Sequence, residues 1–170
     1  MQFKIILHTT AYSSLPFNYW YPLSAAIYKI IEAADKSFGT FLHNTGYGDG
    51  NKSFKLFTFS DIKTPLKKRG DLMQLLGTEA EVIICFYMLL AAKIFIKALF
   101  KYQQLQIADR QSKTAFRIAE VKSLPEVSAN AGSITLQPLS PLVVGRKNEH
   151  GHYNHRSPED SDFADWLYFN

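Results

Sequence analysis

The sequence predicts an α+β fold built on an antiparallel sheet, and three observations carry this prediction. Several short segments alternate apolar and polar residues, as half-buried strands do, and others repeat apolar residues every three or four positions, as one face of a helix does. Each helical pattern is flanked by strand patterns, so helices and strands are interleaved. Hydrophobic residues make up 46% and charged residues 20% of the 170 residues, a balance typical of a globular protein with a real core.

The N-terminal third begins with a strand, predicted at residues 3–8, whose apolar run is too short for a signal peptide. A helix is expected from Pro22, because proline suits a first helical turn and an apolar stripe follows it: Leu23, Ala26, Ile27, Ile30 and Ile31. Tyr28 lies on the border of that stripe. Residues 38–50 are rich in glycine, so we predict a loop there, and this loop contains His43.

Residues 54–62 alternate aromatic or aliphatic with polar residues and predict a half-buried strand, with Lys55 pointing away from the core. A basic loop is expected next, holding Lys63, Lys67, Lys68 and Arg69. Residues 81–90 predict a central strand because they begin with β-branched side chains. This run contains Cys85, the single cysteine, which we expect to be a buried and inert thiol.

Residues 91–104 predict a second helix with an apolar face formed by Ala92, Phe95, Ile96, Leu99 and Phe100, and a ladder of Lys93, Lys97 and Lys101 that is typical of a solvated face. Strands are predicted at residues 105–109 and 115–121. The resulting order is the β-α-β-β-α-β arrangement of a ferredoxin-like fold, with both helices on one face of the sheet. A further strand is expected at residues 134–144, followed by a polar stretch at 145–162 and the start of a helix at 163.

The charge pattern favours a polyanionic partner. The formal net charge is +4, and residues 61–125 carry +5 whereas residues 126–170 carry −3. A basic face attracts RNA because each phosphate contact releases condensed counterions. The longest apolar run, residues 82–92, is shorter than the roughly twenty residues of a membrane span. With no feature that marks export, we expect a cytoplasmic protein without a membrane partner.

Three sequence blocks resemble a known family when their order and spacing are taken together. The first is LPFNYWYPL at residues 15–23, followed by Ile27-Tyr28; the second is FLH at 41–43, followed by FKLFTFS at 54–60; the third is LSP at 139–141. They resemble the CRISPR-associated endoribonucleases of the RAMP superfamily, which have two ferredoxin-like domains and process the precursor of CRISPR guide RNAs. The resemblance implies an RNA-processing domain at 1–125, and a linker with the incomplete start of a second ferredoxin-like domain at 126–170.

The resemblance also implies an activity. Members with a tyrosine, a histidine and a lysine cut RNA without metal through the 2′-hydroxyl, leaving a cyclic phosphate and a 5′-hydroxyl, and the matching positions here are Tyr28, His43 and Lys55. No cofactor is expected. The implied partner is CRISPR repeat RNA, with a homodimer or subunits of a CRISPR effector complex as candidate assemblies. Family members carry a glycine-rich loop near the C-terminus, and none follows residue 166, so we expect a truncated chain.

The residue types agree with this chemistry. The 2′-hydroxyl must lose a proton, the leaving 5′-oxygen must gain one, and negative charge gathers on phosphorus between them. Histidine, with an unperturbed pKa of about 6.5, serves either transfer, and we assign His43 as the general acid. Tyr28 is a candidate base or orients the 2′-hydroxyl; which of Tyr28 and His43 is the base stays open. The phosphate contact falls to Lys55 or, three residues earlier, to Lys52.

Several alternatives remain at this point. By residue type alone, His43 is a surface or turn residue, Tyr28 a core-edge residue and Lys55 a solvated strand residue. Lys52, Lys67, Lys68 and Arg69 are candidate RNA-binding residues or a solvated loop. A cluster of His150, His152 and His155 is a candidate zinc or nickel site, or else the tip of a polar hairpin. At the level of function, the alternatives are a non-catalytic RNA-binding or assembly protein of the same superfamily and an unrelated ferredoxin-like interaction module.

Overall fold

A computed structural model describes residues 1–48, 53–125 and 143–169, and the chain folds into two compact units, Met1–Val127 and Ser128–Asn170. The first unit contains, in chain order, β1 (Gln2–His8), β2 (Ser14–Pro16), α1 (Trp20–Ala34), α2 (Lys36–Asn44), β3 (Tyr47–Gly48), β4 (Ser53–Phe54), β5 (Phe57–Phe59), β6 (Leu66–Arg69), β7 (Leu72–Leu75), β8 (Glu79–Phe86), α3 (Leu89–Tyr102), β9 (Gln104–Ala108) and β10 (Lys113–Leu124). The second contains β11 (Val144–Lys147), β12 (Tyr153–Arg156) and α4 (Phe163–Phe169).

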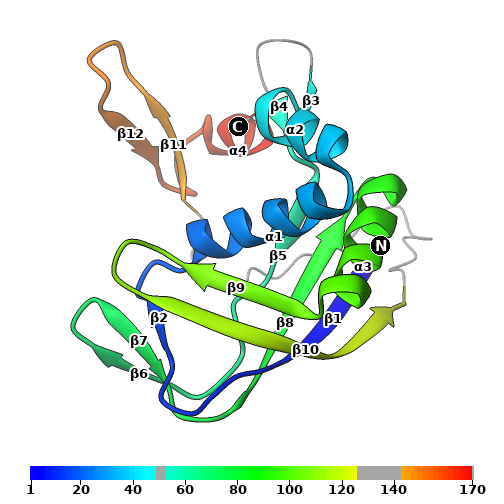
Figure 1. The fold of residues 1–170 in the computed structure, drawn as a ribbon. Helices are drawn as coiled ribbons and strands as arrows, with labels where there is room; N and C mark the ends of the chain where they lie inside the picture. Colours follow the sequence, from blue (N-terminus) through cyan, green and yellow to red (C-terminus); the bar gives the residue numbers. More distant parts are fainter. Residues whose placement is uncertain (49–52, 126–142, 170) are drawn as a thin grey trace. The chain divides into compact units, whose positions relative to one another are not determined.

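The main sheet of the first unit has the strand order β5-β8-β1-β10-β9, and every neighbouring pair is antiparallel. Helices α1 and α3 lie on the same face of this sheet (Figure 1). The elements β1, α1, β5, β8, α3 and β10 follow the predicted β-α-β-β-α-β order, so the ferredoxin-like prediction is confirmed. Strand β9 confirms the strand predicted at residues 105–109 and stands outside that order, and α2 is a helix that was not predicted.

The core lies between the sheet and these helices. Alternate residues of β1 and β8 are buried, among them Ile5 and Val82, which are register partners. Helix α1 buries the predicted stripe. Helix α3 buries a face rotated from the predicted one, formed by Ala91, Ala92, Phe95, Ala98 and Leu99, while Phe100 is exposed. The apolar pattern alone did not indicate that the three alanines belong to this face.

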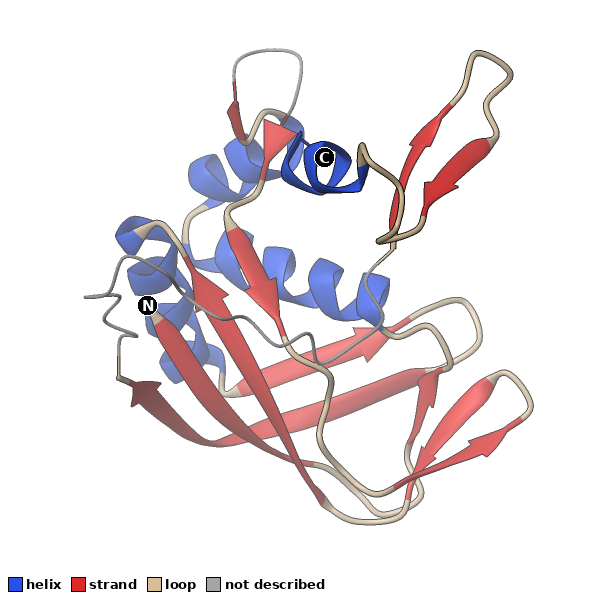
Figure 2. Cartoon of the chain, turned by 180° about the vertical axis from the view of Figure 1, so that it is seen from behind, coloured by secondary structure: helices blue, strands red, loops and turns tan. Residues whose placement is uncertain are grey.

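The prediction of a loop over residues 38–50 is wrong for its first part, which is helix α2 (Figure 2). Asp35 ends α1 and caps α2, because its Oδ1 accepts a hydrogen bond of 2.9 Å from the Phe38 N–H. His43 therefore stands in the last turn of a helix. Gly39, which we interpreted as a loop former, is a buried residue of this helix.

Two further predictions between residues 54 and 76 are corrected. The single strand at 54–62 is interrupted, because Leu56 has a positive φ of 53°, and β4 and β5 stand on either side of it. The basic loop is instead the hairpin β6–β7, which turns at Gly70 with a φ of +58°. This hairpin joins β2 in a separate three-stranded sheet, β2-β7-β6, and β3 pairs with β4.

Strand β8 ends at Phe86, earlier than predicted, and α3 starts at Leu89. Cys85 is half-buried, since it alternates with the buried Ile84 and Phe86 and lies on the face of the sheet away from the helices. Desolvation by this partial burial raises the pKa of its thiol. A raised thiol pKa lowers the thiolate fraction, as expected for an unreactive cysteine.

The second unit is a hairpin and a helix. Strands β11 and β12 pair from Val144↔Arg156 to Lys147↔Tyr153, within the stretch predicted only as polar. The α4 helix agrees with the helix predicted from residue 163. The centre of the Trp166 ring lies 4.9 Å from the guanidinium carbon of Arg146 and 4.2 Å from that of Arg156. The predicted strand at 134–144 falls almost entirely outside the described residues.

Among the described residues, no helix is both long and apolar enough to cross a bilayer. The interpretation of residues 82–92 as core is right only in part, because Tyr87, Leu89 and Leu90 are exposed. That segment is divided between β8 and α3, and neither element approaches the length of a spanning helix.

The Asp35 cap predicts a pH-dependent contribution to stability. Its pKa is lowered, chiefly by the hydrogen bond from the Phe38 backbone N–H, so the folded state favours the carboxylate. The stabilisation is therefore present above the unfolded pKa of about 3.9 and is lost as the pH falls through the lower folded value. Asp35→Ala should lower the melting temperature at pH 7, and the difference from the parent should shrink below about pH 4.

The matched control for this prediction is Asp35→Asn, because asparagine caps helices about as well but does not titrate. It should keep most of the melting temperature at neutral pH. A difference between Asp35→Ala and the parent that stays constant down to pH 2 would contradict the role of the carboxylate charge.

Candidate active site

The site is formed where α2 folds back along α1. A Cβ atom added to Gly39 would lie 2.6 Å from both Cα and Cβ of Glu32, so only glycine permits this approach of the two helices. Helix α2 runs back along α1. His43 stands one turn after Gly39 on α2, and Tyr28 stands one turn before Glu32 on α1, so His43 lies beside Tyr28. The Tyr28 and His43 rings meet edge to face, with centroids 6.0 Å apart.

Tyr28 is held from both sides. Its ring also packs against Phe57 of β5, with centroids 5.2 Å apart at 76°. The side chain is half-buried, and desolvation raises the pKa of its phenol. The Tyr28 hydroxyl therefore keeps its proton at neutral pH, and it is well placed to orient a bound group.

The His43 side chain is exposed at the C-terminal end of α2. Its Nδ1 lies 3.0 Å from Oδ1 of Asn44. An amide oxygen only accepts, so this bond requires the hydrogen on Nδ1 and leaves Nε2 available to a ligand. A single ring nitrogen is therefore presented for proton transfer.

Lys55 reaches back from the β4–β5 segment to the end of α2. Its Nζ donates hydrogen bonds to the carbonyl oxygens of Leu42 at 2.6 Å and His43 at 3.0 Å. These are carbonyls of the last helical turn, which carry partial negative charge and lack helical partners. An ammonium group has three hydrogens, so one remains for a further acceptor. The half-buried side chain differs from the predicted outward orientation, because the left-handed Leu56 turns the chain here.

The structure brings Tyr28, His43 and Lys55 together in one pocket of about 340 Å³, whose other lining residues are Tyr21, Ser24, Ala25, Lys29 and Glu32. A neighbouring pocket of about 280 Å³ shares Glu32 and His43. The sequence interpretation missed Tyr21, Ser24, Lys29 and Glu32. Tyr21 and Ser24 stand seven and four residues before Tyr28, and Glu32 stands four residues after it. Helical spacing around Tyr28 could therefore have indicated that these residues share its face of the helix.

Helix α1 is anchored at its start by a carboxylate. Trp20 Nε1 donates to Oδ1 of Asp61 at 2.6 Å, and the Tyr19 hydroxyl donates to the same atom at 3.2 Å. The Tyr19 oxygen also accepts from the Ile62 N–H at 3.2 Å, and burial raises the pKa of this phenol. These bonds tie α1, which carries Tyr28, to the segment after β5.

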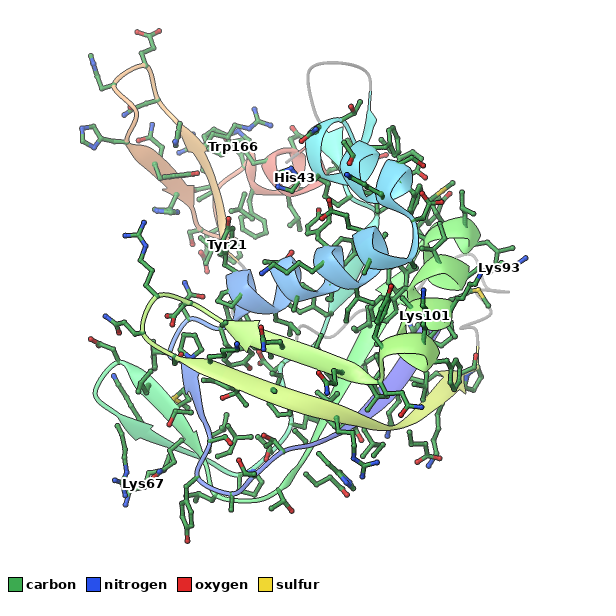
Figure 3. The ribbon with its side chains drawn as sticks, in the orientation of Figure 1. Tyr21, His43, Lys67, Lys93, Lys101 and Trp166 are labelled. Carbon is green, nitrogen blue, oxygen red and sulfur yellow. The ribbon has the colours of Figure 1, made fainter. Side chains whose placement is uncertain are left out.

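The predicted RNA-binding residues Lys67, Lys68 and Arg69 are exposed on β6, and the Lys68 ammonium lies 4.5 Å from the centre of the Phe17 ring. Lys67 projects from the hairpin far from His43, whereas Lys93 and Lys101 project outward from α3 (Figure 3). The structure therefore separates the β6 cations from the pocket. Lys52 lies outside the described residues.

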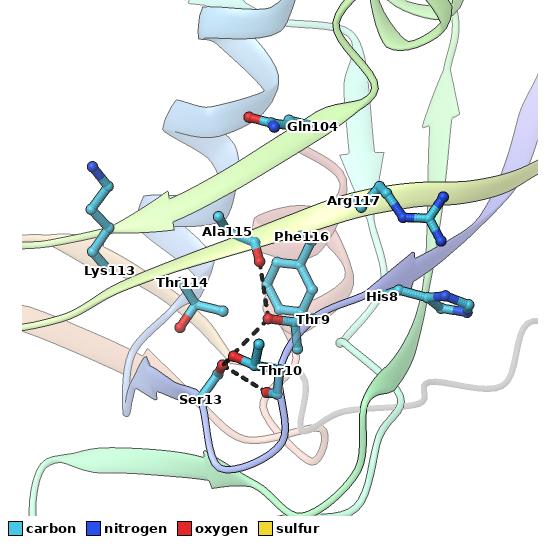
Figure 4. Close-up of a pocket in the computed structure, with 10 residues that line it drawn as sticks. All are labelled: His8, Thr9, Thr10, Ser13, Gln104, Lys113, Thr114, Ala115, Phe116 and Arg117. Atoms are coloured by element: carbon cyan, nitrogen blue, oxygen red, sulfur yellow. Dashed lines mark hydrogen bonds between the residues drawn. The ribbon is translucent and has the colours of Figure 1, made fainter.

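A larger pocket, of about 510 Å³, lies at the end of β1 beside β9 and β10 (Figure 4). The hydroxyl groups of this pocket are hydrogen-bonded within the protein. The Thr9 hydroxyl donates to the Ala115 carbonyl at 2.9 Å, and the Thr10 and Ser13 hydroxyls are 2.9 Å apart. Its imidazole, His8, lies 3.3 Å from the Glu79 carboxylate. Size alone does not identify a reactive site, and we place the candidate site at the smaller pocket, where an imidazole, a phenol and an ammonium group converge.

The three histidines of the second unit belong to the β11–β12 hairpin. Asn148 Oδ1 accepts hydrogen bonds of 3.0 Å from the backbone N–H groups of His150 and His152 at its turn, and the His155 ring stacks on Tyr153. Within the described part of the chain, no three His, Cys, Asp or Glu side chains are grouped as metal ligands. The residues agree with the polar hairpin tip considered from the sequence.

Comparison with known proteins gives concordant results for fold and sequence. The chain is similar in structure to a Cas6-related protein of Pyrococcus furiosus (TM-score 0.69, 23% identity, covering 98% of this chain and 66% of that one). It is also similar to a CRISPR associated protein Cas6 (TM-score 0.63, 23% identity, 96% and 64%) and to a RAMP protein described as binding different RNA substrates (TM-score 0.66, 20% identity, 98% and 67%).

At these identities the structural matches establish a shared fold, and the chain spans about two thirds of the length of each of these proteins. The comparison with curated proteins gives no match. The family model described as CRISPR-associated protein Cas6, N-terminal, matches residues 14–122. This range includes every described residue that lines the pocket of Tyr28, His43 and Lys55. The chain therefore belongs to the family of CRISPR-associated Cas6 proteins, of which it carries the N-terminal region.

Proposed function

We propose that this chain cleaves CRISPR precursor RNA without a metal ion, by attack of a 2′-hydroxyl on the neighbouring phosphate. The convergence of Tyr28, His43 and Lys55 in one pocket carries the proposal. Membership of the Cas6 family supports an RNA substrate, as does the net charge of +4. CRISPR repeat RNA is thus the proposed partner.

The pocket supplies the groups that this reaction needs. His43 presents Nε2 and, when protonated, donates a proton to the leaving 5′-oxygen. The third hydrogen of Lys55 is available to a phosphate oxygen, where it would stabilise charge that builds up in the transition state. Tyr28 is placed to orient the 2′-hydroxyl. Lys67, Lys68 and Arg69 on β6 are proposed to hold phosphates away from the cut.

The direct test is cleavage of a repeat RNA by the 170-residue chain in EDTA. The expected products are an upstream fragment ending in a cyclic phosphate, which resists phosphatase until acid opens it, and a downstream fragment with a 5′-hydroxyl, which a kinase labels directly. Once the cut is mapped, one 2′-deoxy nucleotide immediately before it should block cleavage. Cutting that needs added Mg²⁺, or a 5′-phosphate product, would contradict the proposal.

A second candidate function is RNA binding or complex assembly without cleavage. Membership of the Cas6 family supports binding of CRISPR RNA as well as its cleavage. Salt-dependent binding of repeat RNA with no cleavage would support this function. Homodimer formation and association with effector-complex subunits remain predictions, and sedimentation of the chain with and without RNA would test the first.

Lys55→Met is expected to lower the cleavage rate by about 10²-fold or more, the usual cost of one charge-stabilising donor. Because Lys55 also binds the Leu42 and His43 carbonyls, the melting temperature should fall as well. Lys97→Met, which removes an exposed lysine of α3, is the matched control and should change neither quantity. A rate within about threefold of the parent would remove Lys55 from the proposed chemistry.

A further inference from the structure

Glu32 occupies a position in the site that the proposed mechanism has not used. It stands one helical turn after Tyr28 on α1, so both side chains leave the same face of the helix. Gly39 of α2 packs against its Cα and Cβ atoms. Glu32 lines both the pocket that holds Tyr28 and Lys55 and the neighbouring pocket, and His43 is the other residue that both share.

The carboxylate is available to a ligand. To the described residues, Glu32 makes no hydrogen bond and no ion pair, although Lys29 and Lys55 line the same pocket. Those two ammonium groups offset the repulsion that a carboxylate would exert on an incoming phosphate. A glutamate with no function on a helix surface would also be unpaired. The chemistry of the pocket therefore has to decide whether Glu32 is a functional residue or a solvated surface residue.

The reaction needs two proton transfers and therefore two different groups. If His43 gives a proton to the leaving oxygen, another group must take the proton of the 2′-hydroxyl. Tyr28 is poorly suited, because burial raises the pKa of its phenol and it keeps its proton at neutral pH. Lys29 and Lys55 are cations. Among the described residues that line either pocket, Glu32 is the one carboxylate, and a carboxylate is free of a proton at neutral pH.

We propose that Glu32 is the general base of the reaction, a role that rests on the function proposed above. As the 2′-oxygen forms its bond to phosphorus, its proton passes to the Glu32 carboxylate. As the bond from phosphorus to the 5′-oxygen breaks, that oxygen takes the proton of the His43 imidazolium. The products are the 2′,3′-cyclic phosphate and the 5′-hydroxyl, and exchange with water returns the two side chains to their starting protonation states.

Glu32 and His43 are separated in the way that an in-line displacement requires of its base and its acid. The attacking and leaving oxygens lie on opposite sides of phosphorus, so base and acid must be separated. Glu32 comes from α1 and His43 from α2, and their charged atoms are more than 4.0 Å apart, since no ion pair forms between them among the described residues. A phosphate between them would face Lys55.

The test compares Glu32→Gln with the parent chain. Glutamine keeps the shape of the side chain and loses the basic oxygen pair, so the single-turnover rate at saturating RNA should fall by about 10²-fold or more. RNA affinity should be unchanged or tighter because a negative charge is removed, and the melting temperature should be unchanged. Glu120→Gln, an exposed carboxylate of β10, is the matched control.

The pH profile adds a readout that a structural role would not move. The parent rate should rise with pH on its acid side, and Glu32→Gln should lack that limb. Among the described residues, the other charged or titratable groups that face the pocket are Tyr21, Tyr28, Lys29, His43 and Lys55. A rate within about threefold of the parent, or an unaltered acid limb, would overturn the proposal. A fall in rate matched by a fall in melting temperature would also overturn it.

The outcomes separate this proposal from the function on which it rests. Cleavage by the parent and loss of cleavage in His43→Ala, with full activity in Glu32→Gln, would leave the proposed function intact and remove Glu32 as its base. If the parent chain binds repeat RNA but does not cut it, the proposed function fails and the role of Glu32 fails with it.

Discussion

His43→Ala is expected to reduce the rate of RNA cleavage by about 10²- to 10⁴-fold, the contribution of one proton transfer. The imidazole has a single free nitrogen, because Nδ1 is bound to Asn44, and it faces the pocket shared with Lys55. Its backbone carbonyl still accepts from Lys55 after the substitution, so the end of α2 should stay folded. The rate should be measured in EDTA under single-turnover conditions.

His152→Ala is the control for this experiment, since that side chain is exposed on the β11–β12 hairpin of the second unit. It should cut RNA as fast as the parent chain. RNA affinity should be nearly equal in the parent and in His43→Ala, because the loss falls on the chemical step. Cleavage that continues at the parental rate in His43→Ala would place the reaction elsewhere in the molecule.

Gly39→Ala should lower both stability and activity. The new methyl group would lie 2.6 Å from Glu32 Cα, a backbone atom that cannot move aside, so the two helices must separate. Overpacking of this kind costs about 1–3 kcal/mol, which exceeds the roughly 1 kcal/mol by which alanine favours a helix over glycine. Because α2 carries His43, a displacement of about 1 Å should also cost about 10²-fold in rate.

Gly77→Ala is the matched control, because an added Cβ there has nothing within 4 Å and the backbone needs no positive φ. That change should leave the free energy of unfolding within about 1 kcal/mol of the parent, or raise it slightly. Thermal unfolding and the single-turnover rate are the two measurements. Equal stability of Gly39→Ala and the parent would show that the helices are not closely packed at this point.

The sequence by itself determined the ferredoxin-like order and the residues of the family motif. Period-two and helical patterns located β1, β8, α1 and α3 to within a few residues, because a buried face repeats with the period of its element. The same patterns identified the buried stripe of α1. Tyr28, His43 and Lys55 were named from the resemblance, and they line one pocket.

Only the tertiary structure decided how those side chains converge. Gly39 was interpreted as a loop residue because glycine weakens helices on its own, whereas here it stands inside a helix that needs its missing side chain. The capping of α2 by Lys55 and the exposure of Glu32 in both pockets also depend on contacts between distant segments. Local sequence patterns report burial along one element, while a reactive site depends on the distances between elements, which packing alone sets.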